Sequence, residues 1–243
     1  MKLVWCPDTA SKAYIDGVRA IANDASADGS PELAELVAAM AGGWNAQLIV
    51  DAPYVDVDAS PPPSSSRRPP ATSLALAAAA RRTGGRYARL DNDNDNDGAT
   101  TQEAINSSSA AEAAMARLEG VDLLVLDARR RDAAAVLRAA RPGPRGMVVV
   151  RHGDTTGGGV RRRAAASATA SATAPWGTMA AGTRVVRAAY LPIGAGGVEV
   201  LHVGVGKGPS LPTAQQQSRR SGRGRWIRHV NHRTGEEHVF RRQ

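Results

Sequence analysis

The sequence predicts an α/β three-layer sandwich, in which helices cover both faces of a mostly parallel β-sheet with an antiparallel strand near its edge. Short apolar runs alternate with helix-like segments through the first 152 residues, and parallel sheets buried on both faces are typically built from such runs. Further along, two strand-like segments flank a glycine-rich turn from Gly194 to Gly197. A turn this short joins antiparallel neighbours. These two observations define the predicted mixed sheet.

The helices are predicted from start and stop signals around amphipathic segments. Asp8 or Thr9 is expected to cap a first helix after Pro7. The second helix begins at Ser30 and Pro31, because serine caps a helix and proline suits its first position. Three more helices are expected at residues 74–82, 110–118 and 132–141.

The strands are predicted from apolar runs that lie between these helices. The clearest is the run from Val121 to Asp127, which is rich in leucine and valine and has the length of a strand. The other expected strands cover residues 47–51, 86–90, 147–151, 184–193 and 198–205. Residues 225–230 and 236–241 predict a final β-hairpin.

Low-complexity segments divide the chain into one domain and a tail. Proline, serine, glycine or an Asp-Asn repeat dominates three stretches, at about residues 53–71, 91–109 and 153–175. Such compositions bury too little apolar area to offset the entropy of ordering, so we interpret them as insertions in loops. The predicted domain therefore covers residues 1–205, and residues 206–243 form a basic C-terminal extension that contains the hairpin.

Composition and charge exclude several classes of protein. A single cysteine, Cys6, excludes an internal disulfide framework. No apolar run is long enough to span a membrane, and the N-terminus lacks a secretory layout. We therefore expect an intracellular protein, cytoplasmic or nuclear, with no membrane partner. The net charge is +8, and residues 219–243 hold eight arginines against two glutamates. The run from Arg219 to Arg242 is thus a candidate for weak polyanion binding.

The order of the segments carries a family likeness. The runs Leu48-Ile49-Val50-Asp51, Gly120-Val121-Asp122-Leu123-Leu124-Val125-Leu126-Asp127 and Pro142-Gly143 before residues 147–150 resemble class I S-adenosylmethionine-dependent methyltransferases. A closer likeness, over nearly the whole chain, is to an uncharacterised plant family often labelled methyltransferase-like. It rests on residues 2–7, 9–15, 41–46, 218–219, 225–227 and 235–238. The resemblance implies a Rossmann-like, seven-stranded sheet and methyl transfer from S-adenosylmethionine to an unknown small-molecule or protein acceptor.

The resemblance also implies where the cofactor would bind. A Rossmann-like sheet binds its ligand outside the carboxyl ends of its strands. Asp51, Asp91 and Asp127 end three predicted strands, and Asp91 in particular would accept hydrogen bonds from ribose hydroxyls. Thr72 and Ser73 are expected to cap the helix at residues 74–82, where free backbone amides favour a carboxylate. The alternative is that all three aspartates are polar strand ends or caps.

Departures from the family pattern leave two functions open. No glycine stands between Asp51 and Gly84, although the resembled enzymes place a glycine-rich loop directly after the first strand. Arg151 and His152 stand where a second metal-binding acid belongs, so no metal is expected, and no catalytic base is identified. The chain is either a methyltransferase-like enzyme or a non-enzymatic binding or scaffold protein on the same fold.

Two clusters have open interpretations. Arg129, Arg130 and Arg131 follow Asp127, where they would either bind an anionic substrate or form a solvated helix start. The histidines of the tail are His229, His232 and His238. Their spacing fits no standard zinc pattern, so we interpret them as part of a solvated hairpin.

Overall fold

The computed structural model describes residues 5–24, 29–54, 69–90, 107–153, 179–194, 197–206, 226–230 and 237–241, with backbone alone for residues 107–109 and the last two ranges. These residues belong to two compact units. The first comprises Met1–Gly159 and Pro175–Ser210, and the second comprises Val160–Ala174 and Leu211–Gln243.

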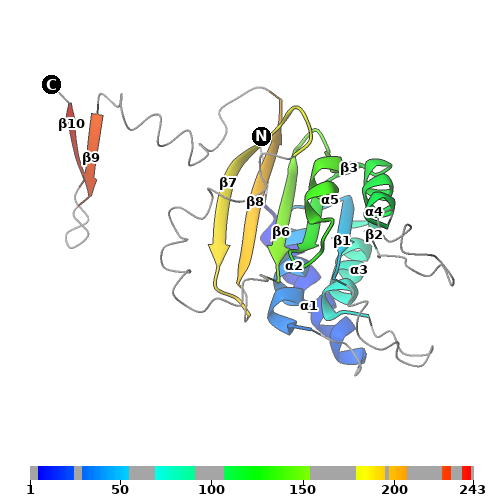
Figure 1. The fold of residues 1–243 in the computed structure, drawn as a ribbon. Helices are drawn as coiled ribbons and strands as arrows, with labels where there is room; N and C mark the ends of the chain where they lie inside the picture. The colour runs from blue at the N-terminus through cyan, green and yellow to red at the C-terminus, as the bar shows by residue number, and fades with distance from the viewer. Residues whose placement is uncertain are drawn as a thin grey trace. The chain divides into compact units, whose positions relative to one another are not determined.

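A six-stranded sheet forms the centre of the first unit, in the order β2-β1-β4-β6-β8-β7 (Figure 1). Its strands are β1 (Leu48–Ala52), β2 (Arg86–Arg89), β4 (Leu123–Asp127), β6 (Met147–His152), β7 (Thr183–Leu191) and β8 (Val198–Val205). The strands β2, β1, β4 and β6 are mutually parallel. Strand β8 runs antiparallel to both of its neighbours, β6 and β7. The predicted mostly parallel sheet with an antiparallel strand near the edge is confirmed.

Helices cover both faces of the sheet, which confirms the three-layer sandwich (Figure 1). The helices are α1 (Pro7–Asn23), α2 (Pro31–Gly43), α3 (Ala71–Thr83), α4 (Ser107–Ala116) and α5 (Ala133–Ala139). One core lies between the sheet and α1, α2 and α3, and the other lies between the sheet and α4 and α5. Side chains alternate along a strand, so Ile49 enters the first core and Val50 the second. The central strands are therefore apolar on both faces.

Small residues bring the three helices of the first layer close together. Gly42 of α2 lies so near α1 that a Cβ there would collide with the Cβ of Ala13 and the carbonyl of Thr9. Gly17 of α1 lies against the Cβ of Ala38. This close approach explains part of the alanine and glycine content of the first helices.

Both predicted side-chain caps at the starts of α1 and α3 are wrong. Helix α1 begins at Pro7 with Cys6 in the capping position, so neither Asp8 nor Thr9 caps it. Helix α3 begins at Ala71 after Pro70, and neither Cys6 nor Pro70 makes a side-chain cap hydrogen bond. Thr72 and Ser73 consequently lie inside the first turn of α3. Proline is tolerated at a helix start because the N–H that it lacks would be unpaired there in any residue.

The predicted strand from Val121 to Asp127 is interrupted at Asp122. Its first part, β3 (Glu119–Val121), pairs in parallel with the short strand β5 (Arg141–Pro142) as a separate sheet, and its second part is β4. The Asp122 carboxylate accepts hydrogen bonds from the backbone N–H groups of Gln47, at 2.7 Å, and Leu48, at 3.4 Å. Asp122 therefore ties the start of β4 to the start of β1.

The main sheet has six strands among the described residues, whereas the resemblance implies seven. Residues 91–106, between β2 and α4, lie outside the described part of the chain. Most of the three predicted insertions also lies outside it. Residues 53, 54, 69–71, 107–109 and 153 of these insertions are described, and residues 71 and 107–109 belong to α3 and α4. Within the described ranges, every helix is too short or too polar to cross a membrane.

The described backbone of the second unit is an antiparallel pair of strands, β9 (Trp226–Val230) and β10 (Glu237–Arg241) (Figure 1). These strands lie where the sequence predicts the final hairpin. The rest of the basic run from Arg219 to Arg242 lies outside the described residues.

Candidate functional site

Asp51 and Asp127 lie at the same edge of the sheet. Strands β1 and β4 are parallel neighbours, with Asp51 opposite Val125 and Ala52 opposite Leu126, so both strands present their carboxyl ends to this edge. The two aspartates are 1% and 2% exposed. Thr72 and Ser73 are also buried, in the first turn of α3. Asp91 lies outside the described residues, although Leu90 before it is described.

Asp51 is bound by side chains from two neighbouring elements. Its Oδ2 accepts a hydrogen bond of 2.5 Å from Ser73 Oγ on α3 and one of 3.0 Å from the Tyr87 hydroxyl on β2. Burial raises the pKa of Tyr87, and the negative charge of Asp51 raises it further, so the phenol stays a donor. Tyr87 is a site residue that sequence reasoning missed. These contacts tie β1, β2 and α3 together at the edge of the sheet.

Asp127 is paired with Arg129. Arg129 Nη2 donates to Asp127 Oδ2 at 2.7 Å, and Arg129 Nε and the backbone N–H donate to Oδ1 at 3.0 and 2.9 Å. His152 Nδ1 lies 3.9 Å from Asp127 Oδ2. Burial lowers the pKa of His152, although the charge of Asp127 opposes that effect. The imidazole is therefore predominantly neutral near pH 7.

Two further residues enclose the Asp127 carboxylate and its partner. The Arg129 guanidinium lies 4.7 Å from the centre of the Tyr54 ring, at a distance suited to a cation–π interaction. Gly153 has a φ of +73°, and a Cβ there would collide with the Asp127 carboxylate. The carboxylate is thus covered on the side of β6, where only glycine leaves room for it.

Arg130 fills the space between the strand ends. Its side chain is 0% exposed. Its Nη1 donates to the backbone carbonyl of Pro53, which follows β1, at 2.8 Å and to that of Leu90, which follows β2, at 2.9 Å. Its Nε and Nη2 donate to the two carboxylate oxygens of Asp132 at 2.8 and 2.7 Å. A guanidinium thus bridges the chain after β1, β2 and β4.

Sequence reasoning did not distinguish Arg130 from its neighbours. Arg129 and Arg131 are adjacent to it in the same run, yet Arg129 is half exposed and Arg131 is exposed. The signal that points to Arg130 is the acid two residues later, Asp132, which is also buried. Buried charges are generally paired, and Asp132 is the buried acid that pairs with Arg130.

Among the described residues, the strand ends at which the resemblance places S-adenosylmethionine are occupied by side chains of the chain itself. Arg130 Nη1 donates to the carbonyl oxygens of both Pro53 and Leu90. The polar groups of Asp51 and Asp127 that would face the cofactor already bind side chains of the chain itself. Among the described side chains, no group of three or more His, Cys, Asp or Glu residues is placed to hold a metal ion.

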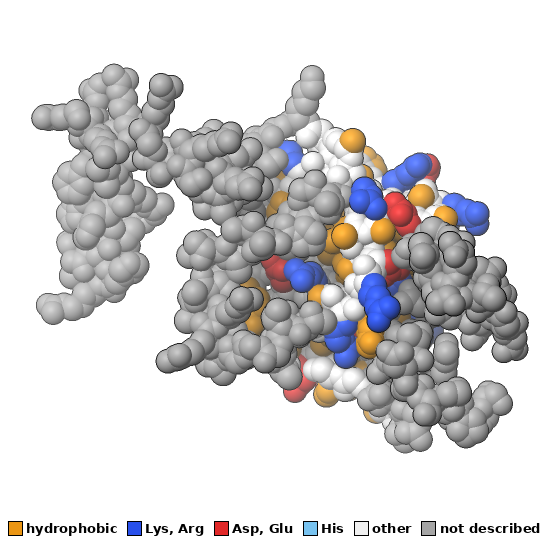
Figure 2. All heavy atoms as spheres, in the orientation of Figure 1, with side chains coloured by type: hydrophobic (Ala, Val, Ile, Leu, Met, Phe, Trp, Pro, Cys, Tyr) orange, Lys and Arg blue, Asp and Glu red, His pale blue; other side chains and the backbone are white. Residues whose placement is uncertain are grey.

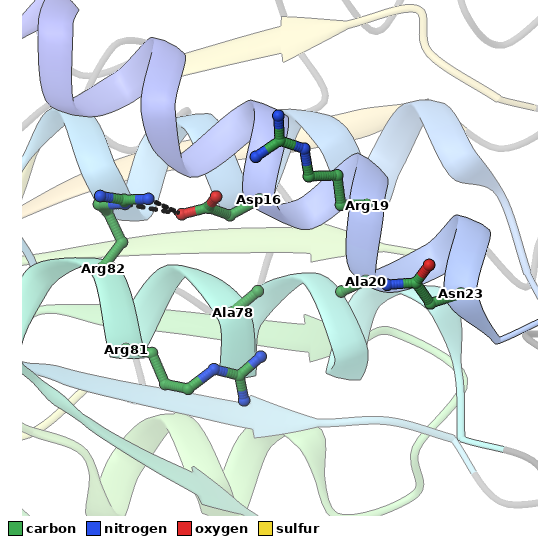
Figure 3. A pocket seen from close by; sticks show the side chains of 7 residues that line it. All are labelled: Asp16, Arg19, Ala20, Asn23, Ala78, Arg81 and Arg82. Atoms are coloured by element: carbon green, nitrogen blue, oxygen red, sulfur yellow. Dashed lines mark hydrogen bonds and ion pairs between the residues drawn. The ribbon is translucent and has the colours of Figure 1, made fainter.

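A hollow of about 410 Å³ lies elsewhere, on the outer side of α1 and α3 (Figure 3). Its lining is Asp16, Arg19, Ala20, Asn23, Ala78, Arg81 and Arg82. Arg82 forms an ion pair of 2.6 Å with Asp16, and Figure 3 shows Arg19 and Arg81 extending in different directions. On the face drawn in Figure 2, basic side chains likewise occur in separate groups with acidic ones between them. The hollow therefore lacks the convergent cations that a small anion requires.

The sheet order, the reversed strand β8 and the acids that end β1 and β4 define a Rossmann-like α/β domain that is compatible with a methyltransferase-like fold. Residues 1–242 match the model of the family described as "Protein of unknown function (DUF1442)", and the chain belongs to that family. No curated protein matches the chain.

Proposed function

We propose that the protein is a non-enzymatic binding or scaffold protein on a degenerate methyltransferase-like fold. The observation that carries this proposal is the buried guanidinium of Arg130, which bonds to the chain after β1 and β2 and to Asp132. Rossmann-like sheets bind nucleotide-like ligands outside these same strand ends. A side chain held there by four short hydrogen bonds excludes such a ligand.

The energetic cost of making room supports the proposal. Separating Arg130 from Asp132 would leave a buried charge without its partner, which costs about 3–5 kcal/mol. Since 1.4 kcal/mol is a tenfold change in affinity, a cofactor that had to displace Arg130 would bind roughly 150- to 4,000-fold more weakly than at an open site. The absence of glycine between Asp51 and Gly84 removes the close backbone contacts that would offset this loss.

The partner proposed for such a protein follows from its charge. Residues 219–243 carry eight arginines, so an acidic partner or a polyanion is the chemistry that this tail favours. Binding through the tail would be salt-dependent and would be lost when residues 219–243 are removed.

Methyl transfer from S-adenosylmethionine to an unknown acceptor is the second candidate. It is favoured by one observation, namely that Asp51 and Asp127 are both buried at the carboxyl ends of neighbouring parallel strands. In this candidate Asp51, Thr72, Ser73, Asp91 and Asp127 would line the cofactor crevice. The Arg130 side chain would have to leave its present hydrogen bonds before the crevice could accept a ligand.

Calorimetry separates the two candidates. S-adenosylmethionine and its demethylated product are titrated into the full-length protein and into the Asp51→Ala and Asp127→Ala variants. The matched control is Asp122→Ala, which removes an aspartate that likewise accepts hydrogen bonds but lies at the opposite edge of the sheet. The scaffold proposal expects no binding heat from the wild type at millimolar ligand. Saturable binding that Asp51→Ala and Asp127→Ala weaken, and Asp122→Ala does not, would overturn it.

A further inference from the structure

We propose that the antiparallel end of the main sheet carries a binding surface for single-stranded nucleic acid. This β7–β8 surface consists of five side chains, namely Trp5, Trp44, Arg184, Arg187 and His202. His202 is the partner of Val148 near the start of β6, so the surface lies toward the opposite edge of the sheet from the buried aspartates of the candidate site. The proposal therefore goes beyond the scaffold function and does not depend on it.

Three rings form a row on this surface. The ring centroids of Trp5 and Trp44 are 5.5 Å apart, and those of Trp44 and His202 are also 5.5 Å apart, both in edge-to-face arrangements. Trp5 packs over Gly43, where a Cβ would collide with its ring, yet it is 46% exposed. Burial lowers the pKa of His202, and the positive charge of Arg187 lowers it further, so the imidazole is neutral near pH 7. An accessible ring held in one orientation is suited to stacking against a base.

A β-bulge places two arginines on the same face as this row. Arg184 is the partner of Gly204 on β8, and Arg187 is the partner of His202. Residues three apart in a regular strand lie on opposite faces, but the register shifts by one residue at Val186, which brings both arginines to one face. A Cβ at Gly204 would lie 3.7 Å from the guanidinium carbon of Arg184. The Arg184 side chain therefore lies across this face of β8.

The nearest acid on β8 lies on the other face of the sheet. Glu199 is three residues from His202 in a regular strand, and its carboxylate is 3.5 Å from Arg151 on β6. Arg187, by contrast, is exposed on the face with the rings. The β7–β8 surface thus combines positive charge with aromatic groups.

This combination favours a single strand over other polyanions. Guanidinium groups bind phosphates through a planar, bidentate geometry, and the bases of a single strand are free to stack on aromatic side chains. An acidic peptide would use the two arginines but would leave the row of rings without a role. A duplex would also leave it without a role, because the faces of its bases are stacked on one another.

The test measures the fluorescence anisotropy of a labelled oligothymidine titrated with the full-length protein. An oligothymidine of about 20 nucleotides exceeds the site sizes of about 4–16 nucleotides found in single-strand-binding folds. We expect saturable binding that is tighter than binding of a duplex of the same length. Trp5→Ala is expected to weaken binding of the oligothymidine by roughly 5- to 150-fold, the range that corresponds to one base–aromatic stack, and to leave duplex binding unchanged. The arginines of residues 219–243 are expected to act on both probes alike.

Matched controls separate this surface from general effects of charge and exposure. Tyr190→Ala removes an aromatic residue of the same strand that is 48% exposed but is the partner of Glu199, on the other face; it is expected to leave the affinity unchanged. Arg187→Gln is expected to lower the slope of log affinity against log salt by about 0.7, the value for one phosphate contact to a single strand. Arg138→Gln, which removes an exposed arginine of α5, should leave that slope as in the wild type.

A conservative variant distinguishes stacking from a requirement for folding. Trp5→Phe keeps an aromatic ring, so it is expected to retain binding that Trp5→Ala loses, while the part of the tryptophan emission that the oligothymidine quenches disappears. The proposal is wrong if the duplex binds as tightly as the oligothymidine, or if Trp5→Ala and Tyr190→Ala have equal effects. It is also wrong if polyglutamate displaces the oligothymidine as effectively as unlabelled oligothymidine does, since the surface would then recognise acidic peptides.

Discussion

Replacement of Arg130 by methionine removes the buried cation that joins the strand ends while keeping a long, unbranched side chain. The variant leaves the Asp132 carboxylate, whose side chain is 3% exposed, without its bidentate partner. It also removes the donor shared by the carbonyls of Pro53 and Leu90. We expect the Arg130→Met variant to fold less stably than the wild type.

The expected loss is large because one member of a buried ion pair is deleted. Such deletions cost about 3–5 kcal/mol, and a domain of this size loses roughly 2–4 °C in Tm per kcal/mol, so the expected fall is roughly 6–20 °C. The double variant Arg130→Met/Asp132→Leu removes both charges. It is expected to recover part of the loss, because an apolar replacement of a whole buried pair is often close to neutral.

Urea unfolding followed by circular dichroism measures these free energies of unfolding. Arg131→Met is the control, because Arg131 is the next residue and its side chain is exposed. An exposed substitution of this kind changes stability by about 0.5 kcal/mol or less. If Arg130→Met were no more destabilising than Arg131→Met, the assignment of Arg130 as an internal tie between the strand ends would be wrong.

Three further outcomes are expected. Tyr87→Phe removes one of the hydrogen bonds to the buried Asp51 carboxylate and is expected to lower the free energy of unfolding in urea by about 1.5–3 kcal/mol; an unchanged value would contradict the contact. Gly153→Ala and Gly84→Ala both place alanine at positive φ, but only Gly153→Ala introduces a clash, with the buried Asp127 carboxylate. The loss of Tm should therefore be clearly greater for Gly153→Ala. Equal losses would refute the enclosure of that carboxylate. Burial lowers the pKa of His152 in the folded state, so the unfolded chain binds more protons below the ordinary histidine pKa of about 6.5. The resulting stability is present above that pH and is lost as the pH falls through the lowered folded-state pKa. His152→Gln should therefore flatten the dependence of the free energy of unfolding on pH in urea titrations between pH 7 and 5. An unaltered slope of that free energy against pH would argue against the burial of His152.

The architecture was accessible from the sequence because burial on both faces imposes an apolar pattern. Residues 48–50 and 147–150 are uninterrupted apolar runs, and both form central strands of the sheet. The short glycine-containing turn before Val198 likewise indicates the antiparallel end, and β7 and β8 pair there as expected. The local composition thus indicates whether one face of a strand is buried or both.

The candidate site was accessible only in part. Asp51 and Asp127 were expected at one edge because parallel neighbours end there, and β1 and β4 do pair in parallel with both aspartates toward their carboxyl ends. The role of Ser73 was not accessible, since its hydroxyl bonds to Asp51, which lies far from it in sequence, instead of capping its own helix. Arg130 was hidden within a run of similar residues, because the conformation of the turn after β4 decides which arginine is buried. Tyr87 was missed because its strand is weakly apolar.

The position of Arg130 also has a consequence for length differences between members of this family. Two low-complexity runs begin shortly after Pro53 and Leu90, whose carbonyls are both held by that single side chain. The sheet is thereby anchored upstream of each run, so residues gained or lost beyond the anchor points leave strand pairing undisturbed. Natural variants of this family should accordingly tolerate large changes in these two runs while an arginine and its acidic partner persist after β4.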